Sequence, residues 1–234
     1  MFALLSVAFA AEQHLVYDLS VNGAPVGTRE VTVRYLPREG GERRVIEAYT
    51  TLTVGETALV CRTSGSSGPR GATFTSAVDA NGNLSEVQGV SLPGGGWRLT
   101  VTDAKGTRET KLTRDDAQLS SLDLLDPTRN RVLQVPGNVG IVLVETGDVV
   151  RGAVAEGAEG QAKIAGTKVP VTRYAVDGLG GRATFDLDGD GLLLRSELAW
   201  IGSVVVATVH AIPEARSWGT IEAVEEAGVE AEAL

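Results

Sequence analysis

One stretch of the sequence has the spacing of a calcium-binding loop. Carboxylates stand at its first, third, fifth and twelfth positions, and they are Asp186, Asp188, Asp190 and Glu197. Calcium takes roughly six to eight hard oxygen ligands, so three aspartates, a backbone carbonyl and a bidentate glutamate suit the ion. Gly191 allows the sharp turn that such a loop needs. The loop by itself therefore indicates a Ca²⁺ site.

The residues on either side of this loop are typical of strands. An EF-hand loop lies between two helices, whereas here a glycine-rich stretch at 178–181 precedes the loop and a valine-rich stretch at 202–206 follows it. A plain β-hairpin with its turn at Asp188–Gly191 is the favoured interpretation. The alternative is weak calcium binding by the same carboxylates, without an EF-hand. No cofactor is required by any other motif.

Other residue types that carry catalysis are scarce. The chain has two histidines, His14 and His210, so a zinc cluster or a histidine-based triad has little to draw on. Its one cysteine, Cys61, follows Leu59 and Val60, which predicts a buried thiol and not a nucleophile. We therefore expect a protein that is not an enzyme.

Composition and charge exclude several classes of protein. The chain has 234 residues, 29 of them glycine, and 43% are hydrophobic, which is enough apolar material for a core. The glycines have no three-residue period, which excludes collagen, and the ample valine and leucine exclude a disordered chain. The formal net charge of −9 argues against nucleic acid as a partner, because a phosphate backbone requires a basic face.

The two ends differ from the rest of the chain. Residues 1–11 are apolar and end in small residues, which resembles a secretory signal peptide, although an apolar first strand is the alternative. Residues 219–234 carry five glutamates and no basic residue, which predicts a solvated acidic tail. Residues 12–218 are expected to form a single β-sheet domain. They contain no uncharged apolar run of about 18 residues, so no transmembrane segment is expected after the N-terminus.

Alternation of apolar and polar residues is the dominant pattern between these ends. In 31–35 and 97–102 every second residue is apolar, which places one face of a strand on a core and the other in water. Further strand-like segments are 44–54, 84–90, 139–144, 168–176 and 202–210. Glycine turns such as Asn22–Gly23 and Asn81–Gly82 separate them. The sequence predicts an all-β fold, a curved antiparallel meander that forms a half-barrel or open barrel.

One internal segment has the pattern of a helix. Thr113 precedes 114–122, acidic residues occupy its first turn, and Pro127 would end any continuation. We expect one short helix here, near the middle of the chain.

Two stretches resemble a known family. Residues 17–27 (YDLSVNGAPVG) resemble the opening of the DUF3108-like proteins of bacterial envelopes, a domain family of unknown function. Residues 164–174 (IAGTKVPVTRY), followed by the Phe185–Asp186 hairpin, resemble the second half of that family. The resemblance implies an exported antiparallel sheet, a half-barrel like the lipoprotein carriers, with no established catalytic residues.

Two functions follow as expectations. The first is a noncatalytic envelope protein, periplasmic or secreted, whose curved sheet shelters an apolar small molecule or lipid. The alternative is a structural or protein-interaction module with an envelope protein as partner and a calcium-stabilised hairpin.

Overall fold

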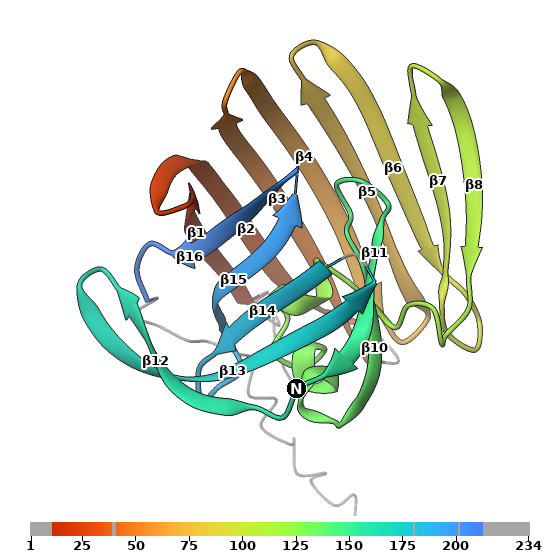
Figure 1. The fold of residues 1–234 in the computed structure, drawn as a ribbon. Helices are drawn as coiled ribbons and strands as arrows, with labels where there is room; N and C mark the ends of the chain where they lie inside the picture. Colours follow the sequence, from red (N-terminus) through yellow and green to blue (C-terminus); the bar gives the residue numbers. More distant parts are fainter. Residues whose placement is uncertain (1–10, 39–40, 180, 201, 213–234) are drawn as a thin grey trace, which may run out of the picture.

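The computed structural model describes residues 11–38, 41–179, 181–200 and 202–212, and most of them lie in the strands of one sheet (Figure 1). The strands are β1 (Ala11–Val21), β2 (Ala24–Arg38), β3 (Gly41–Val54), β4 (Thr57–Gly68), β5 (Gly71–Ala80), β6 (Asn83–Ser91), β7 (Trp97–Asp103), β8 (Gly106–Leu112), β9 (Leu119–Ser120), β10 (Gly137–Val142), β11 (Val149–Val154), β12 (Ala158–Ile164), β13 (Thr167–Leu179), β14 (Gly181–Leu187), β15 (Leu193–Trp200) and β16 (Ser203–Val209). Two 3-10 helices, η1 (Asp123–Leu125) and η2 (Asn130–Gln134), lie between β9 and β10.

The sheet is an open, curved meander, and the first and last strands of the chain are neighbours in its middle. Strands β8 to β1 follow one another in reverse order, and β1 then pairs with β16, so the first and last strands lie side by side. The path continues through β15, β14, β13, β11 and β10 to β9, while β12 pairs with β13 off this path. All pairs are antiparallel except β9 with β10. The predicted all-β curved sheet is confirmed.

Tight two-residue turns join several of these strands. Asn22–Gly23, Asn81–Gly82 and Ala165–Gly166 each have both residues at positive φ, with values of 50° and 79°, 53° and 83°, and 47° and 84°. This is the type I′ geometry, whose twist matches that of the two strands it connects. These turns fix the register of the hairpins β1–β2, β5–β6 and β12–β13.

Alternation along the strands places the core on the concave face. In β5 the inward residues Ala72, Phe74, Ser76 and Val78 are buried, and the residues between them are exposed. Trp97 on β7, 2% exposed, lies against Phe74 with ring centroids 5.5 Å apart. The convex face of this wall is open to solvent.

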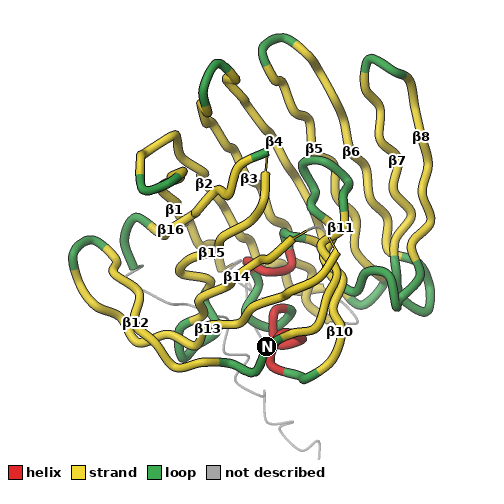
Figure 2. Tube along the Cα trace, in the orientation of Figure 1, coloured by secondary structure: helices red, strands yellow, loops and turns green. Residues whose placement is uncertain are grey.

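The helix expected over 114–122 is not formed, so its predicted position is wrong. Residues 113–117 make a single turn, in which the amides of Asp116 and Ala117 both donate to the Thr113 carbonyl at 3.1 Å. The chain then extends, because the amides of Gln118 and Ser121 donate to carbonyls of β10, at 2.9 and 2.8 Å. The short helices near the middle of the chain are η1 and η2, which begin after this point (Figure 2).

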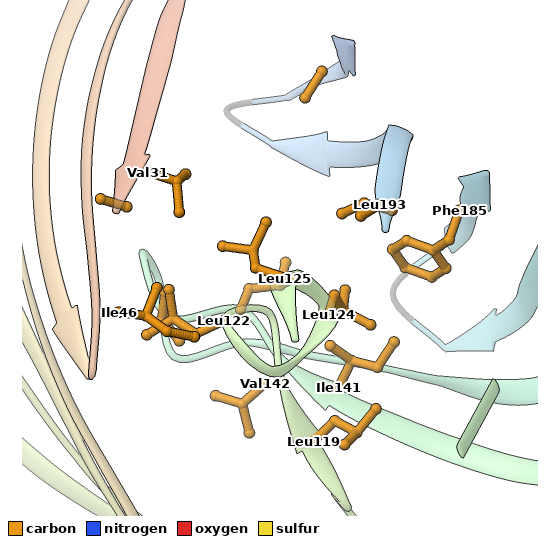
Figure 3. Packing of buried hydrophobic residues seen from close by; sticks show 14 of the residues in the cluster. Val31, Ile46, Leu119, Leu122, Leu124, Leu125, Ile141, Val142, Phe185 and Leu193 are labelled. Atoms are coloured by element: carbon orange, nitrogen blue, oxygen red, sulfur yellow. The ribbon is translucent and has the colours of Figure 1, made fainter. Parts of the chain in front are cut away.

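The segment between β8 and β11 lies inside the curve of the sheet. We call residues 113–148 the plug; it contains β9, η1, η2 and β10. Leu122, Leu124 and Leu125 of the plug lie between the two walls of the sheet, with Val31 and Ile46 on one side and Phe185 and Leu193 on the other (Figure 3). All seven are 7% exposed or less. The core is therefore formed between the sheet and its own inserted segment.

The predicted signal segment 1–11 and the acidic tail 219–234 lie, apart from Ala11, outside the described residues and stay predictions. Ala11 is the first residue of β1. Among the described residues, no helix is long and apolar enough to cross a membrane.

Candidate functional site

The concave face of the sheet is the candidate site, and the plug covers it. Two glycines of the interface leave room for close packing. A Cβ on Gly65 of β4 would lie 2.6 Å from Cδ1 of Leu122, and one on Gly147 of the plug would lie 2.8 Å from Cγ2 of Val101. The plug therefore packs directly on the inner side of the wall formed by β4 and β7.

Polar contacts also attach the plug to the sheet, and we call three of them the latches. Arg29 of β2 forms an ion pair with Glu145, and Arg44 Nη1 of β3 lies 3.0 Å from Oδ2 of Asp126. Asn130 Nδ2 donates to the Gly191 carbonyl at 2.7 Å, which joins the plug to the β14–β15 turn. The latches connect the plug to both walls of the sheet.

The three plug residues that form the latches are buried. Glu145, Asp126 and Asn130 are 8%, 1% and 0% exposed. Burying an ion pair costs hydration free energy that is about as large as the Coulomb attraction between the two charges, so the pair adds little net stability. Removing one partner is nevertheless costly, because the other charge stays buried alone. The latches thus set the position of the plug more than they strengthen its attachment.

Arg29 has further partners on the inner face. Its Nε donates to Thr50 Oγ1 at 3.0 Å, and its guanidinium carbon lies 5.9 Å from the centre of the Trp200 ring. This arrangement orients the guanidinium toward the plug.

A narrow apolar crevice opens beside this latch, where the plug meets β1, β15 and β16. Its apolar lining is Leu19, Leu143, Leu198, Trp200, Val205 and Ala207, and both Arg29 and Glu145 border it. The free space is about 30 Å³, room for a water molecule or two. A site for a lipid chain needs at least roughly 300 Å³. In this conformation the concave face is filled, and a ligand of that size requires the plug to move.

Asp123, the first residue of η1, makes the folding stability depend on pH. Burial raises the pKa of Asp123, and this effect outweighs the opposing effects of the Arg129 ion pair at 2.8 Å and the hydrogen bonds from Ser120. A folded-state pKa above the unfolded value of about 3.9 means that folding favours the protonated form. The stabilisation is therefore complete below that unfolded pKa and is lost as the pH rises through the folded-state pKa.

We expect the Asp123→Asn variant to keep its stability as the pH rises through the folded-state pKa of Asp123. Between about pH 4 and pH 7 the melting temperature of the variant should rise relative to that of the wild type, because asparagine does not ionise. Circular dichroism melts over this range measure the difference, with Asp115→Asn on the exposed turn as the control. A difference that stays constant with pH would contradict the raised pKa.

The first predicted calcium ligand, Asp186, lies between two arginines. Arg173 of β13 binds it in a bidentate ion pair, with Nε to Oδ1 at 2.6 Å and Nη2 to Oδ2 at 2.7 Å. Arg195 of β15 lies 3.8 Å from Oδ2. Hydrogen bonding to Asp186 raises the pKa of Arg173, so this guanidinium stays charged.

The other three predicted ligands lie apart from this pair. Asp188 Oδ1 accepts the amides of Asp190 and Leu192, at 2.9 and 3.0 Å, and so closes the hairpin turn. Asp190 is exposed, and Glu197, on β15, forms an ion pair with Arg195. In the described part of the chain no three His, Cys, Asp or Glu side chains form a group that could hold a metal ion. The flanks are strands, which agrees with the hairpin interpretation, and calcium binding stays a prediction.

A melt with and without calcium tests this prediction. We expect millimolar Ca²⁺ to raise the melting temperature by about 1 °C or less, equivalent to a few tenths of a kcal/mol, because arginines already neutralise two of the carboxylates. An unchanged melt removes calcium from the account, whereas a rise of about 5 °C would show that the loop rearranges around the ion.

Cys61 and the two histidines form none of the latches. Cys61 is 1% exposed, and burial raises the pKa of its thiol, so the predicted buried thiol is confirmed. His14 is exposed on β1, and His210 Nδ1 lies 2.9 Å from Asp18 Oδ2 on the surface.

Comparison with known proteins gives a fold and no family. No protein-family model and no curated protein matches the chain. The crystal structure of a β-barrel-like protein of the domain of unknown function DUF1849 from Brucella abortus is similar to 86% of this chain and 96% of its own, with a TM-score of 0.51 and 11% identity. The fold is that of a β-barrel-like domain. The expected DUF3108 assignment is not confirmed, since the neighbour belongs to a different domain family.

Proposed function

We propose that this β-barrel-like domain is a noncatalytic, exported envelope protein whose curved sheet shelters an apolar ligand or lipid when the plug is displaced. The observation that carries the proposal is the pairing of a largely apolar inner face with a cover that is part of the same chain. Export is supported by the signal-like residues 1–11, with a periplasmic or secreted location.

Exchange of the central part of the plug, residues 119–133, for a lipid chain is close to energetic balance. This part buries Leu119, Leu122, Leu124, Leu125 and Leu133, whereas β10 stays paired with β11. At about 1.5–3 kcal/mol each, these five side chains contribute about 8–15 kcal/mol. A chain of about sixteen methylene groups would recover about 13 kcal/mol at 0.8 kcal/mol per group. Release also hydrates the buried acids of the plug, but it leaves Arg29 and Arg44 on the sheet without their carboxylates.

The binding of an apolar fluorescent probe tests this proposal. We expect N-phenylnaphthylamine to bind the Glu145→Gln variant about tenfold more tightly than the wild type. Weakening one latch by about 1.4 kcal/mol raises the population of the open state tenfold. Glu109→Gln on the exposed outer face of β8 removes the same charge and should leave probe binding unchanged. The intrinsic fluorescence of Trp200, beside the Arg29 latch, reports the same opening.

Near-ultraviolet circular dichroism of each variant separates an opened plug from a disrupted core. A variant that keeps its native near-ultraviolet spectrum and binds the probe no better than the wild type would contradict the proposal.

A structural or protein-interaction module is the second candidate, and the free edge of the sheet favours it. In the part of the chain that the structure describes, β8 pairs only with β7, and six of its seven residues are exposed. A free edge can accept a strand from an envelope partner, although the charged Arg108, Glu109 and Lys111 of β8 oppose unspecific pairing. Photo-crosslinking in the host tests this function, with a crosslinker at position 109 on β8 and a control crosslinker at position 28 on β2. An envelope protein that crosslinks to position 109 and not to position 28 would support it.

A further inference from the structure

Four cations gather at one end of the convex face of the sheet. They are Arg43 on β3, Arg70 in the β4–β5 turn, Arg98 on β7 and Lys111 on β8, and we call them the cation band. Arg44 points inward to the plug, so its neighbour Arg43 points outward, where its Nη2 donates to Ser66 Oγ at 3.2 Å. Arg98 and Lys111 are directly opposite each other on paired strands, beside Val90.

The cation band has no carboxylate partners among the described residues. No ion pair within 4.0 Å joins any of its members to an acid there, whereas Arg34, Arg108 and Arg173 on the same sheet each have one. Glu109, an acid of the same face, lies two residues from Lys111 along β8, about 7 Å away. The acid of β8 therefore lies farther along the strand and does not neutralise Lys111.

A polar hollow of about 670 Å³ lies within the band. Arg43 and Arg70 line it together with Ser66, Thr73 and Ser91, and no acidic residue lines it. Val90, 40% exposed, also borders it. The lining thus offers guanidinium and hydroxyl donors, the groups that bind phosphate oxygens.

We propose that the cation band docks the protein on the surface of an anionic phospholipid bilayer. From β3 to β8 the band crosses five strand spacings, about 24 Å. One small anion would reach only part of this length, whereas lipid phosphates recur along it. An anionic bilayer repels the chain as a whole, whose net charge is −9, so the cation band is the part that turns toward the surface.

Each basic residue near an anionic bilayer strengthens binding about fivefold, the equivalent of about 1 kcal/mol. Binding through four cations is therefore weak, reversible and sensitive to salt. This proposal does not depend on displacement of the plug, since the band and the plug lie on opposite faces of the sheet.

Vesicle co-sedimentation of the full chain tests the proposal. We expect the protein to pellet with vesicles of equal phosphatidylglycerol and phosphatidylcholine at 20 mM salt, and to stay in solution with phosphatidylcholine alone or at 500 mM salt. The Arg43→Gln/Arg98→Gln variant should bind about 25-fold more weakly, by two steps of about fivefold. Both residues are on the outer face, and matching melting curves show that the fold is kept.

Lys163 and Lys168 give a matched control. They are also a like-charged pair directly opposite each other, on β12 and β13, away from the band. Lys163→Gln/Lys168→Gln makes the same charge change and should leave vesicle binding unaltered.

Three results would overturn the proposal. The first is a wild type that does not pellet with anionic vesicles, and the second is an equal loss of binding in the control variant. In the third, vesicles bind neither the wild type nor the band variant, but 10 mM inorganic phosphate raises the melting temperature of the wild type alone. That result would assign the hollow to a small anion.

Discussion

Replacing Glu145 with alanine is expected to lower the free energy of unfolding by about 2–4 kcal/mol. The substitution leaves the Arg29 guanidinium in the interior without its carboxylate, and an uncompensated buried charge costs about 3–5 kcal/mol. The Arg29 side chain is 18% exposed, so water reduces this penalty. Urea unfolding followed by circular dichroism at pH 7 measures the change.

Two further variants show whether burial is the cause. Arg29→Met/Glu145→Met removes both charges and should lie within about 1 kcal/mol of the wild type, because apolar replacements of a buried pair are often neutral. Glu47→Ala breaks the exposed pair with Arg34 and should cost about 0–1 kcal/mol. If Glu145→Ala costs no more than Glu47→Ala, Glu145 does not hold the plug against the sheet.

Phe185→Ala is expected to cost about 3–5 kcal/mol, the usual range for an aromatic side chain removed from a core. Phe185 is 0% exposed on β14 and lies on the side of the sheet that faces Leu124 of the plug (Figure 3). The substitution removes contacts with the plug and leaves a cavity at their interface. Urea unfolding measures the loss.

The exposed residue Val204 gives the comparison for Phe185. It lies on the outer face of β16 and is 53% exposed. Val204→Ala should change the free energy of unfolding by about 0.5 kcal/mol or less. A cost for Phe185→Ala as small as this would mean that the plug does not pack on β14 in solution.

Local signals in the sequence were enough to predict the hairpins. Asn22–Gly23 and Asn81–Gly82 allow both residues of a turn to take positive φ, and the alternation in 97–102 shows which side chains face the core. Both signals act between neighbours along the chain, so they can be recognised without knowing the fold.

The plug could not be predicted in this way. Thr113 and Asp116 do form a hydrogen-bonded turn of the kind that starts a helix, but β10 supplies partners for the following amides and the chain extends. Those partners are distant in sequence, and so are Arg29 and Glu145, which are separated by 116 residues. A contact of this range depends on how the sheet curves.

The calcium pattern illustrates the same limit at closer range. The spacing of Asp186 and Glu197 fits a metal loop, but the strand register places Asp186 beside Arg173 on one side and Arg195 on the other. The signal that could have revealed this is the pairing of three strands, which depends on register and not on spacing within one loop.

Native mass spectrometry of the protein purified from its own host tests the central claim, that the plug is displaced by an apolar ligand. We expect a bound molecule of lipid mass that is released on collisional activation and is more abundant in Glu145→Gln than in the wild type. Bare polypeptide in both proteins, with the native fold retained, would contradict the account and would leave the plug as a permanent part of the core.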